Sequence, residues 1–250
     1  SNLANDLGDS QKGTDNDQRV GPTRAIQSGK ISQSSMKNAV ALVTLLSLVS
    51  AFWLLYISAD LISDSLIWIY LGLTVLCIVA AILYTVGKSA YGYSGLGDIM
   101  VFLFFGCLSV IGVFTLYGIH FEILTLMPAF TIGFWSAAVL NLNNMRDIVN
   151  DADSSKRTLA VQLGAIRAKY YHFSLILVGL CIWTTLNAVY IYLNDNWVFL
   201  IGIFPTLFLF PHLKKVIKID DPVMYDPELK KVALITFSSS ILFATSLFLV

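Results

Sequence analysis

Two short acidic segments hold the residues best suited to chemistry in this sequence. The first places amides and acids three or four residues apart, on one face of a helix: Asn2, Asn5, Asp6 and Asp9. The second uses a spacing of four: Asn143, Asp147 and Asp151, with Asn144 beside it. Carboxylates stacked in this way repel each other, so each face requires a positive partner.

Magnesium is a suitable partner, because hard divalent cations prefer carboxylate oxygens and Mg²⁺ often shares its shell with substrate phosphates. Two facing acidic helices could hold two Mg²⁺ ions bridged by a diphosphate. Basic residues that could bind phosphate oxygens follow each segment: Arg19 and Arg24 after the first, Lys156 and Arg157 after the second. Solvated helix ends with capping Asp and Asn are the simpler alternative. Two similar clusters, each followed by basic residues, favour the metal interpretation.

A third polar stretch, residues 84–98, contains four glycines and three tyrosines in fifteen residues. A surface loop would account for Gly and Ser, and tyrosines are common at membrane interfaces. Lys88 is its one basic residue, and Asp98 begins the next apolar run, where it could cap a helix or line a site.

The elements that must position these residues are indicated by composition. The chain has 250 residues, 16 basic and 16 acidic, and a formal net charge of zero. Charged residues make up 13%, against about 25% in soluble domains. Mean hydropathy is +0.73. These values exclude an ordinary soluble domain, a disordered chain and a disulfide scaffold, and the neutral charge argues against nucleic-acid binding. They indicate a polytopic membrane protein.

Seven apolar runs are long enough to cross a bilayer. They are residues 38–58, 65–84, 98–118, 122–142, 170–191, 196–211 and 231–250, the sixth being short and ending at Pro211. The runs lack the alternation of membrane β-strands, so the expected fold class is an all-α transmembrane bundle.

The basic residues divide the connections into two sets. All 16 lie in residues 1–37, 85–97, 143–169 and 212–231, whereas residues 59–64, 119–121 and 192–195 contain none. The positive-inside rule assigns the first set, with both acidic segments, to the cytoplasm. The acidic residues of 220–228 are expected in a solvated loop. The histidines, His120, His172 and His212, are expected to have interfacial or packing roles near span ends.

These stretches together resemble the UbiA-type intramembrane prenyltransferases. The family's first pattern, Asn-Asp-x-x-Asp-x-x-x-Asp, is matched by Asn5, Asp6 and Asp9, but its last position falls on Gly13, with Asp15 and Asp17 close by. Its second pattern, Asp-x-x-x-Asp, is matched by Asp147 and Asp151, and Tyr-x-x-x-Lys by Tyr84 and Lys88. Residues 19–24, 91–98 and 156–161 resemble the branch that prenylates 1,4-dihydroxy-2-naphthoate in menaquinone synthesis.

The resemblance implies transfer of a polyprenyl group from a prenyl diphosphate to dihydroxynaphthoate, with decarboxylation. Four acids would hold Mg²⁺, two ions in all: Asp6, Asp9, Asp147 and Asp151. Tyr84 and Lys88 would lie near the reacting centre. The substrates would contact further residues: Asn5, Arg19, Arg24, Tyr91, Tyr93, Asp98, Asn143, Asn144, Lys156 and Arg157. The expected location is the bacterial inner membrane, with the site on the cytoplasmic side and no obligate protein partner.

The family has nine transmembrane helices, with its first Asp pattern at the end of the second. Residues 1–250 are therefore expected to form a single domain with seven full spans and the end of an eighth, lacking helix one and most of helix two. Two alternatives stay open: the same chemistry on another acceptor, such as 4-hydroxybenzoate, homogentisate or a haem or chlorophyll precursor, or a transporter. The absence of charge from spans such as 38–58 disfavours a transporter.

Overall fold

A computed structural model describes residues 1–119 and 122–250, and every regular element in this part of the chain is a helix. The expected all-α class is therefore confirmed, while His120 lies outside the described residues. Seven segments are long and apolar enough to cross a membrane. They are α2 (Gln33–Ser58), α3 (Asp64–Leu83), the run α4–η2–α5 (Gly97–Val101, Phe102–Leu108, Ser109–Leu116), α6 (Ile123–Arg146), α9 (Ala165–Asn194), the run η3–α10–η4–α11 (Trp197–Phe199, Leu200–Ile203, Phe204–Phe208, Leu209–Ile217) and the run η5–α12 (Pro222–Met224, Tyr225–Phe248).

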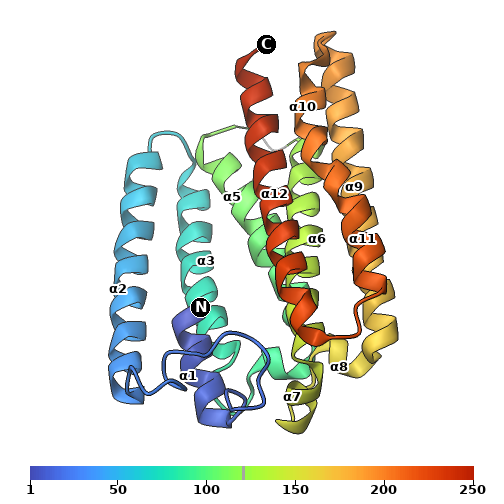
Figure 1. Cartoon of the computed structure of the whole chain (residues 1–250). Helices are drawn as coiled ribbons and strands as arrows, with labels where there is room; N and C mark the ends of the chain where they lie inside the picture. The colour runs from blue at the N-terminus through green and yellow to red at the C-terminus, as the bar shows by residue number, and fades with distance from the viewer. Residues whose placement is uncertain (120–121) are drawn as a thin grey trace.

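Four shorter helices carry part of the polar motifs. They are α1 (Asn2–Lys12), η1 (Tyr91–Ser94), α7 (Ile148–Asp153) and α8 (Leu159–Leu163). Figure 1 shows α1, α7 and α8 gathered at one end of the bundle, opposite the C-terminus. Segments far apart in the sequence thus meet at the end of the bundle that the basic residues assign to the cytoplasm.

The sixth span is longer than the sequence predicts. The run was expected to end at Pro211, but α11 continues to Ile217. Pro211 is the third residue of α11, in the first turn, where a backbone N–H has no partner within the helix and its loss is tolerated. The irregularity falls before it, in the 3₁₀ segment η4, which contains Pro205. The predicted end at Pro211 is therefore wrong.

The core of the bundle lies between α6, α9, α11 and α12. Trp135 of α6 and Trp183 of α9 are each 1% exposed, with ring centroids 6.0 Å apart. By contrast, α2 and α3 stand to one side in Figure 1 and keep most of their apolar side chains exposed. Such a surface suits lipid, which interacts with apolar side chains about as well as other helices do.

The π-helix η2 crosses α6 closely at two glycines. A Cβ on Gly106 would lie 2.5 Å from the Cα of Gly133, and one on Gly133 would lie 2.7 Å from the ring of Phe102. Larger residues would separate the helices here. The crossing fixes the start of α4, and with it Asp98, against α6.

A second polar cluster lies within the bundle, which we call the histidine cluster: His172, His212, Lys215, Glu228 and Lys231. The Nε2 atoms of His172 and His212 are 2.8 Å apart, and His212 Nδ1 donates to Glu228 at 2.6 Å. The two lysines lie 3.0 and 2.8 Å from Glu228 Oε1. The side chains of His172, His212 and Glu228 are fully buried.

The prediction that residues 220–228 form a solvated loop is wrong for Glu228. The last span begins at Pro222 rather than at 231, so Glu228 lies inside a helix and is 0% exposed. The packing role expected for His172 and His212 is confirmed by their burial, although they also form a hydrogen-bonded pair.

Candidate active site

The first acidic segment forms α1, the helix that the spacing predicts, and its two acids are buried. Asp6 is 6% exposed and Asp9 4% exposed. The helix ends at Gly13, which adopts a left-handed conformation with φ of 73°, favourable for glycine at this position. The chain then folds back, so that the N–H of Thr14 donates to the carbonyl of Asp9.

This turn accounts for the departure from the family pattern at Gly13. The carboxylate of Asp15 becomes fully buried beside α1, with Arg19 Nε at 3.3 Å and Arg24 Nε at 4.0 Å. Burial, and then the negative charge of Asp9, raise the pKa of Asp15 to about 6 although both arginines oppose this. Asp15 therefore supplies a third acid close to the place where the pattern expects one.

The second acidic segment does not form one continuous helical face. Helix α6 ends at Arg146, Asp147 adopts φ of −97° and ψ of 12°, and α7 begins at Ile148. The N–H of Asp151 still donates to the carbonyl of Asp147 at 2.8 Å, so the two acids remain one turn apart. Asp147 and Asp151 are 5% and 2% exposed.

Lys156 joins the two acidic segments. Its ammonium lies 3.7 Å from Asp9 Oδ2 and 3.6 Å from Asp151 Oδ1. Nearby, Asn150 Nδ2 donates to the carbonyl of Thr14 at 2.9 Å. Segments more than 130 residues apart in the sequence thus bring carboxylates to either side of one positive charge.

Burial of these acids is only partly balanced. Burial, opposed by Lys156 and reinforced by the charges of Asp147 and Asp9, raises the pKa of Asp151 to about 6. One oxygen of Asp6 and both oxygens of Asp15 accept no hydrogen bond from the residues that the structure describes. Carboxylate oxygens whose charge is not balanced within the protein favour binding of a cation.

The five buried carboxylates of Asp6, Asp9, Asp15, Asp147 and Asp151 are called the acid cluster below. Tyr93, in the loop between α3 and α4, supports this cluster. Its hydroxyl donates to Asp9 at 2.7 Å and lies 2.6 Å from Thr14 Oγ1. The Lys12 ammonium lies 3.9 Å from the centre of its ring. Burial and the charge of Asp9 raise the pKa of the Tyr93 phenol, which keeps it protonated as a donor.

Arg146 is the principal site residue that sequence reasoning missed. It is 4% exposed and donates to both oxygens of Asp147, to Asn143 at 2.8 Å, and to Asp226. A basic residue directly before an acid at the end of an apolar span was the available signal. Its link to Asp226, 80 residues further on, leaves no local pattern.

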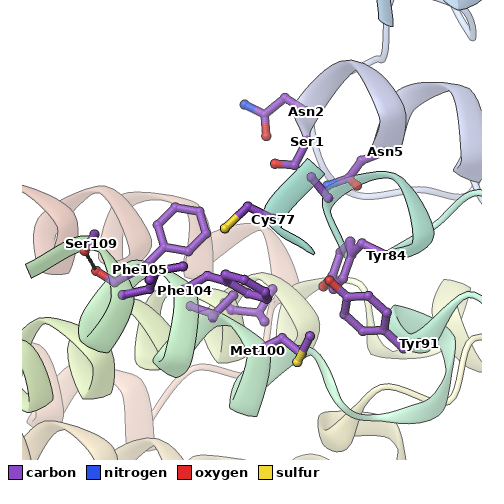
Figure 2. A pocket seen from close by; sticks show the side chains of 14 residues that line it. Ser1, Asn2, Asn5, Cys77, Tyr84, Tyr91, Met100, Phe104, Phe105 and Ser109 are labelled. Atoms are coloured by element: carbon purple, nitrogen blue, oxygen red, sulfur yellow. Dashed lines mark hydrogen bonds between the residues drawn. The ribbon is translucent and has the colours of Figure 1, made fainter. Parts of the chain in front are cut away.

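A cavity of about 510 Å³ is lined by Asn2 and Asn5 of α1, the helix that carries Asp6 and Asp9, although none of the clustered acids lines it. Figure 2 shows Asn5, Tyr84 and Tyr91 on one side of it and Cys77, Phe104 and Phe105 on another. The rings of Tyr84 and Tyr91 meet edge to face, 5.3 Å between centroids. The cavity therefore connects a polar, tyrosine-rich wall to an apolar one.

The remaining expected residues divide into two groups. Asn144 and Asp98 are buried, and Asn5 accepts a hydrogen bond from Thr85 at 3.3 Å. The side chains of Lys88 and Arg157 are exposed, and neither forms an ion pair within the described part of the chain. No ion pair holds either side chain at the acid cluster, although the N–H of Arg157 donates to the carbonyl of Tyr93 at 3.1 Å.

The donor set fits magnesium held together with a substrate. Within residues 1–119 and 122–250, no three His, Cys, Asp or Glu side chains converge closely enough to hold an ion alone. Mg²⁺ is usually held by only one or two carboxylates with phosphate oxygens and water completing its shell. The donors are oxygen atoms only, and the oxygens of Asp6 and Asp15 that accept no hydrogen bond from the described residues fit that arrangement.

Comparison with known proteins gives consistent matches. The model of the UbiA prenyltransferase family matches residues 1–224. The 1,4-dihydroxy-2-naphthoate octaprenyltransferase of Escherichia coli K12 is 37% identical over 249 residues, covering 100% of this chain and 79% of the relative. The protein of the same name from Haemophilus influenzae is 46% identical over 179 residues, covering 72% of this chain.

The coverage of the relatives varies. The chain spans 58% of the Haemophilus influenzae protein. The mouse UbiA prenyltransferase domain-containing protein 1 is 30% identical over 188 residues, which cover 74% of this chain and 53% of the relative. No solved structure matches the chain significantly.

Proposed function

The chain belongs to the UbiA prenyltransferase family, and we propose that it transfers a polyprenyl group from a prenyl diphosphate to 1,4-dihydroxy-2-naphthoate with loss of CO₂. The direct product would be a demethylmenaquinol, which is the reduced form of demethylmenaquinone. The names of the bacterial relatives support this acceptor and an octaprenyl donor. The single observation that carries the site assignment is Lys156, which lies within 3.7 Å of carboxylates from both acidic segments.

The diphosphate would bind between α1 and the α6–α7 junction. The family generally uses Mg²⁺, and two ions held by Asp6, Asp9, Asp147 and Asp151 would neutralise charge on the departing diphosphate. Asp15 would assist on the α1 side. Lys156, which lies near Asp9 and Asp151, would donate to phosphate oxygens, and Arg19 and Arg24 lie beside Asp15.

The allylic cation left by diphosphate departure must be kept from water. The cavity beside α1 supplies an apolar wall for this purpose, with Phe104 and the faces of Tyr84 and Tyr91 able to stabilise positive charge. The ring carbon that bears the carboxylate then attacks, the bond to the carboxyl group breaks, and release of CO₂ restores the aromatic ring.

We further propose that residues 1–250 act as one domain of an integral protein of the bacterial inner membrane, with the site on its cytoplasmic side. The confinement of all 16 basic residues to four connections supports this orientation. The exposed positions of Lys88 and Arg157 leave their assigned roles without contacts that support them.

The test is the Asp147→Ala variant, assayed for demethylmenaquinone from octaprenyl diphosphate, dihydroxynaphthoate and Mg²⁺. We expect a loss of at least about 100-fold in turnover, because charge stabilisation in the transition state is removed. The exposed Asp64, in the first turn of α3, provides a matched control as Asp64→Ala. Near wild-type turnover by Asp147→Ala would contradict the metal assignment, and efficient prenylation of 4-hydroxybenzoate by the wild type would change the proposed acceptor.

A further inference from the structure

Two buried polar side chains near the cavity have no partner within the protein. Asp98, in α4, is 2% exposed, and neither carboxylate oxygen accepts a hydrogen bond from another described residue. Asn141, in α6, is 0% exposed, and neither atom of its amide is bonded within residues 1–119 and 122–250. Buried groups left unsatisfied destabilise a fold, so each requires an explanation such as a ligand.

The packing of α4 on α6 places these two residues in one neighbourhood. A Cβ on Gly97, the residue before Asp98, would lie 3.3 Å from Leu140 Cδ2. Leu140 directly precedes Asn141 and also lines the cavity. The same Cβ would lie 3.0 Å from the hydroxyl of Tyr84. Asp98 and Asn141 therefore flank a contact that reaches the wall of the cavity.

Tyr84 connects this neighbourhood to the acid cluster. Burial, and then the negative charges of Asp98, Asp9 and Asp151, raise the pKa of the Tyr84 phenol. The Tyr84 phenol therefore interacts with the charge of Asp98 and with the charges of both acidic segments.

The charge around Asp98 restricts the ligand it can take. None of the ion pairs in the described chain involves Asp98. A diphosphate would be repelled by an unpaired carboxylate, while a neutral O–H donor would be bound. A phenolic hydroxyl on an aromatic ring meets this requirement, and an amide such as that of Asn141 can pair with a hydroxyl or a carboxylate.

We propose that Asp98 and Asn141 bind the polar edge of the aromatic acceptor, with Asp98 accepting a hydrogen bond from a ring hydroxyl. This inference rests on the proposed function. The charged hydrogen bond would orient the ring toward the allylic carbon and increase electron density at the attacking position. The acceptor site would thereby use other residues than the diphosphate site, and the Tyr84 phenol interacts with charges of both.

The test combines the Asp98→Asn variant with acceptors that lack one hydroxyl. With 1,4-dihydroxy-2-naphthoate we expect kcat/KM for the acceptor to fall about 10- to 100-fold, as for loss of a hydrogen bond to a charged group. The two analogues, 1-hydroxy-2-naphthoate and 4-hydroxy-2-naphthoate, each lack one of the two ring hydroxyls. With the analogue that lacks the hydroxyl bound by Asp98, kcat/KM of the variant and of the wild type should differ by less than about twofold. Equal losses with both analogues would overturn the proposal. Asn141→Leu should likewise lower kcat/KM for the acceptor and leave KM for prenyl diphosphate unchanged.

Two further measurements separate this inference from the proposed function and from misfolding. Mg²⁺-dependent release of diphosphate from prenyl diphosphate without acceptor should persist in Asp98→Asn, and its loss would overturn the assignment of Asp98 to the acceptor. Absence of release from the wild type would instead contradict the proposed function. The melting temperature of Asp98→Asn should equal or exceed that of the wild type and of the exposed control Asp64→Asn, because an unpaired buried charge is removed. A large drop would indicate a structural role.

Discussion

The acid cluster and the histidine cluster are both buried groups of charged residues, but their charges are balanced differently. Glu228 in the histidine cluster receives hydrogen bonds from His212 and from Lys231 and lies 3.0 Å from Lys215. In the acid cluster, one oxygen of Asp6 and both of Asp15 accept no hydrogen bond from a residue the structure describes.

The difference separates a structural role from a functional one. A buried acid whose hydrogen bonds are all made within the protein is stabilised by the fold and has no need of a ligand. Acids held close together with raised pKa values destabilise the fold until a cation binds. Mutation of the acid cluster should therefore lower activity more than stability, and mutation of the histidine cluster should lower stability more than activity.

The largest effect should come from Asp151→Asn. We expect turnover to fall about 100- to 1000-fold, because a charge that holds the metal and diphosphate is lost. The metal-free protein should melt at the same or a higher temperature, since the removed carboxylate is destabilised by burial. Prenyl transfer and thermal unfolding in EDTA measure the two effects. A variant that loses stability and activity together would show that Asp151 is structural.

Glu228→Gln should give the opposite result. We expect a loss of about 2–3 kcal/mol in stability, because the buried partners of Glu228 lose their counter-charge. Turnover per folded molecule should stay within about twofold of wild type, because the histidine cluster forms no hydrogen bond or ion pair with the acid cluster in the described residues. The measurements are denaturation in detergent and activity normalised to folded protein. A turnover loss at unchanged stability would refute the comparison.

Lys156→Met should have a smaller effect. Its ammonium bridges Asp9 and Asp151 at 3.7 and 3.6 Å, so its loss removes a donor to the diphosphate while leaving the acids in place. We expect KM for prenyl diphosphate to rise about 10-fold, with kcat changed less. The exposed Lys230 provides a control as Lys230→Met. An unchanged KM would mean that Lys156 only balances charge.

The features that sequence predicted are those with a local signal. All seven spans were recovered, because about 20 consecutive apolar residues are sufficient to identify a membrane helix. Helical spacing also predicted that Asp6 and Asp9 share one face of a helix, which α1 provides, whereas the break at Asp147 and the burial of the acids depend on packing that spacing does not describe.

The features that sequence missed depend on contacts between distant segments. The pairing of Arg146 with Asp226 and of His212 with Glu228 follows from how α6, α11 and α12 pack, which no spacing rule contains. The turn at Gly13 that buries Asp15 is local, but its direction depends on Arg19, Arg24 and the neighbouring loop. The role expected of Lys88 from its motif stays a prediction, because the fold leaves its side chain exposed and the described residues form no ion pair with it.

The smallest expected effect is a pH dependence of metal-free stability, on the order of 1 kcal/mol per acid after allowance for solvent screening. Asp15 and Asp151 have pKa values of about 6, above the ordinary value of 3.8. Between pH 4 and 6 the folded state keeps protons that the unfolded state has lost, so these two groups make stability fall as pH rises, and the loss is complete above about pH 6. Mg²⁺ binds the ionised acids and should reverse the fall. Thermal unfolding of wild type and Asp15→Asn in EDTA across this range isolates the contribution, since the variant should have the shallower decline. A wild-type decline no steeper than that of Asp15→Asn would show that the acid cluster is as well balanced as the histidine cluster.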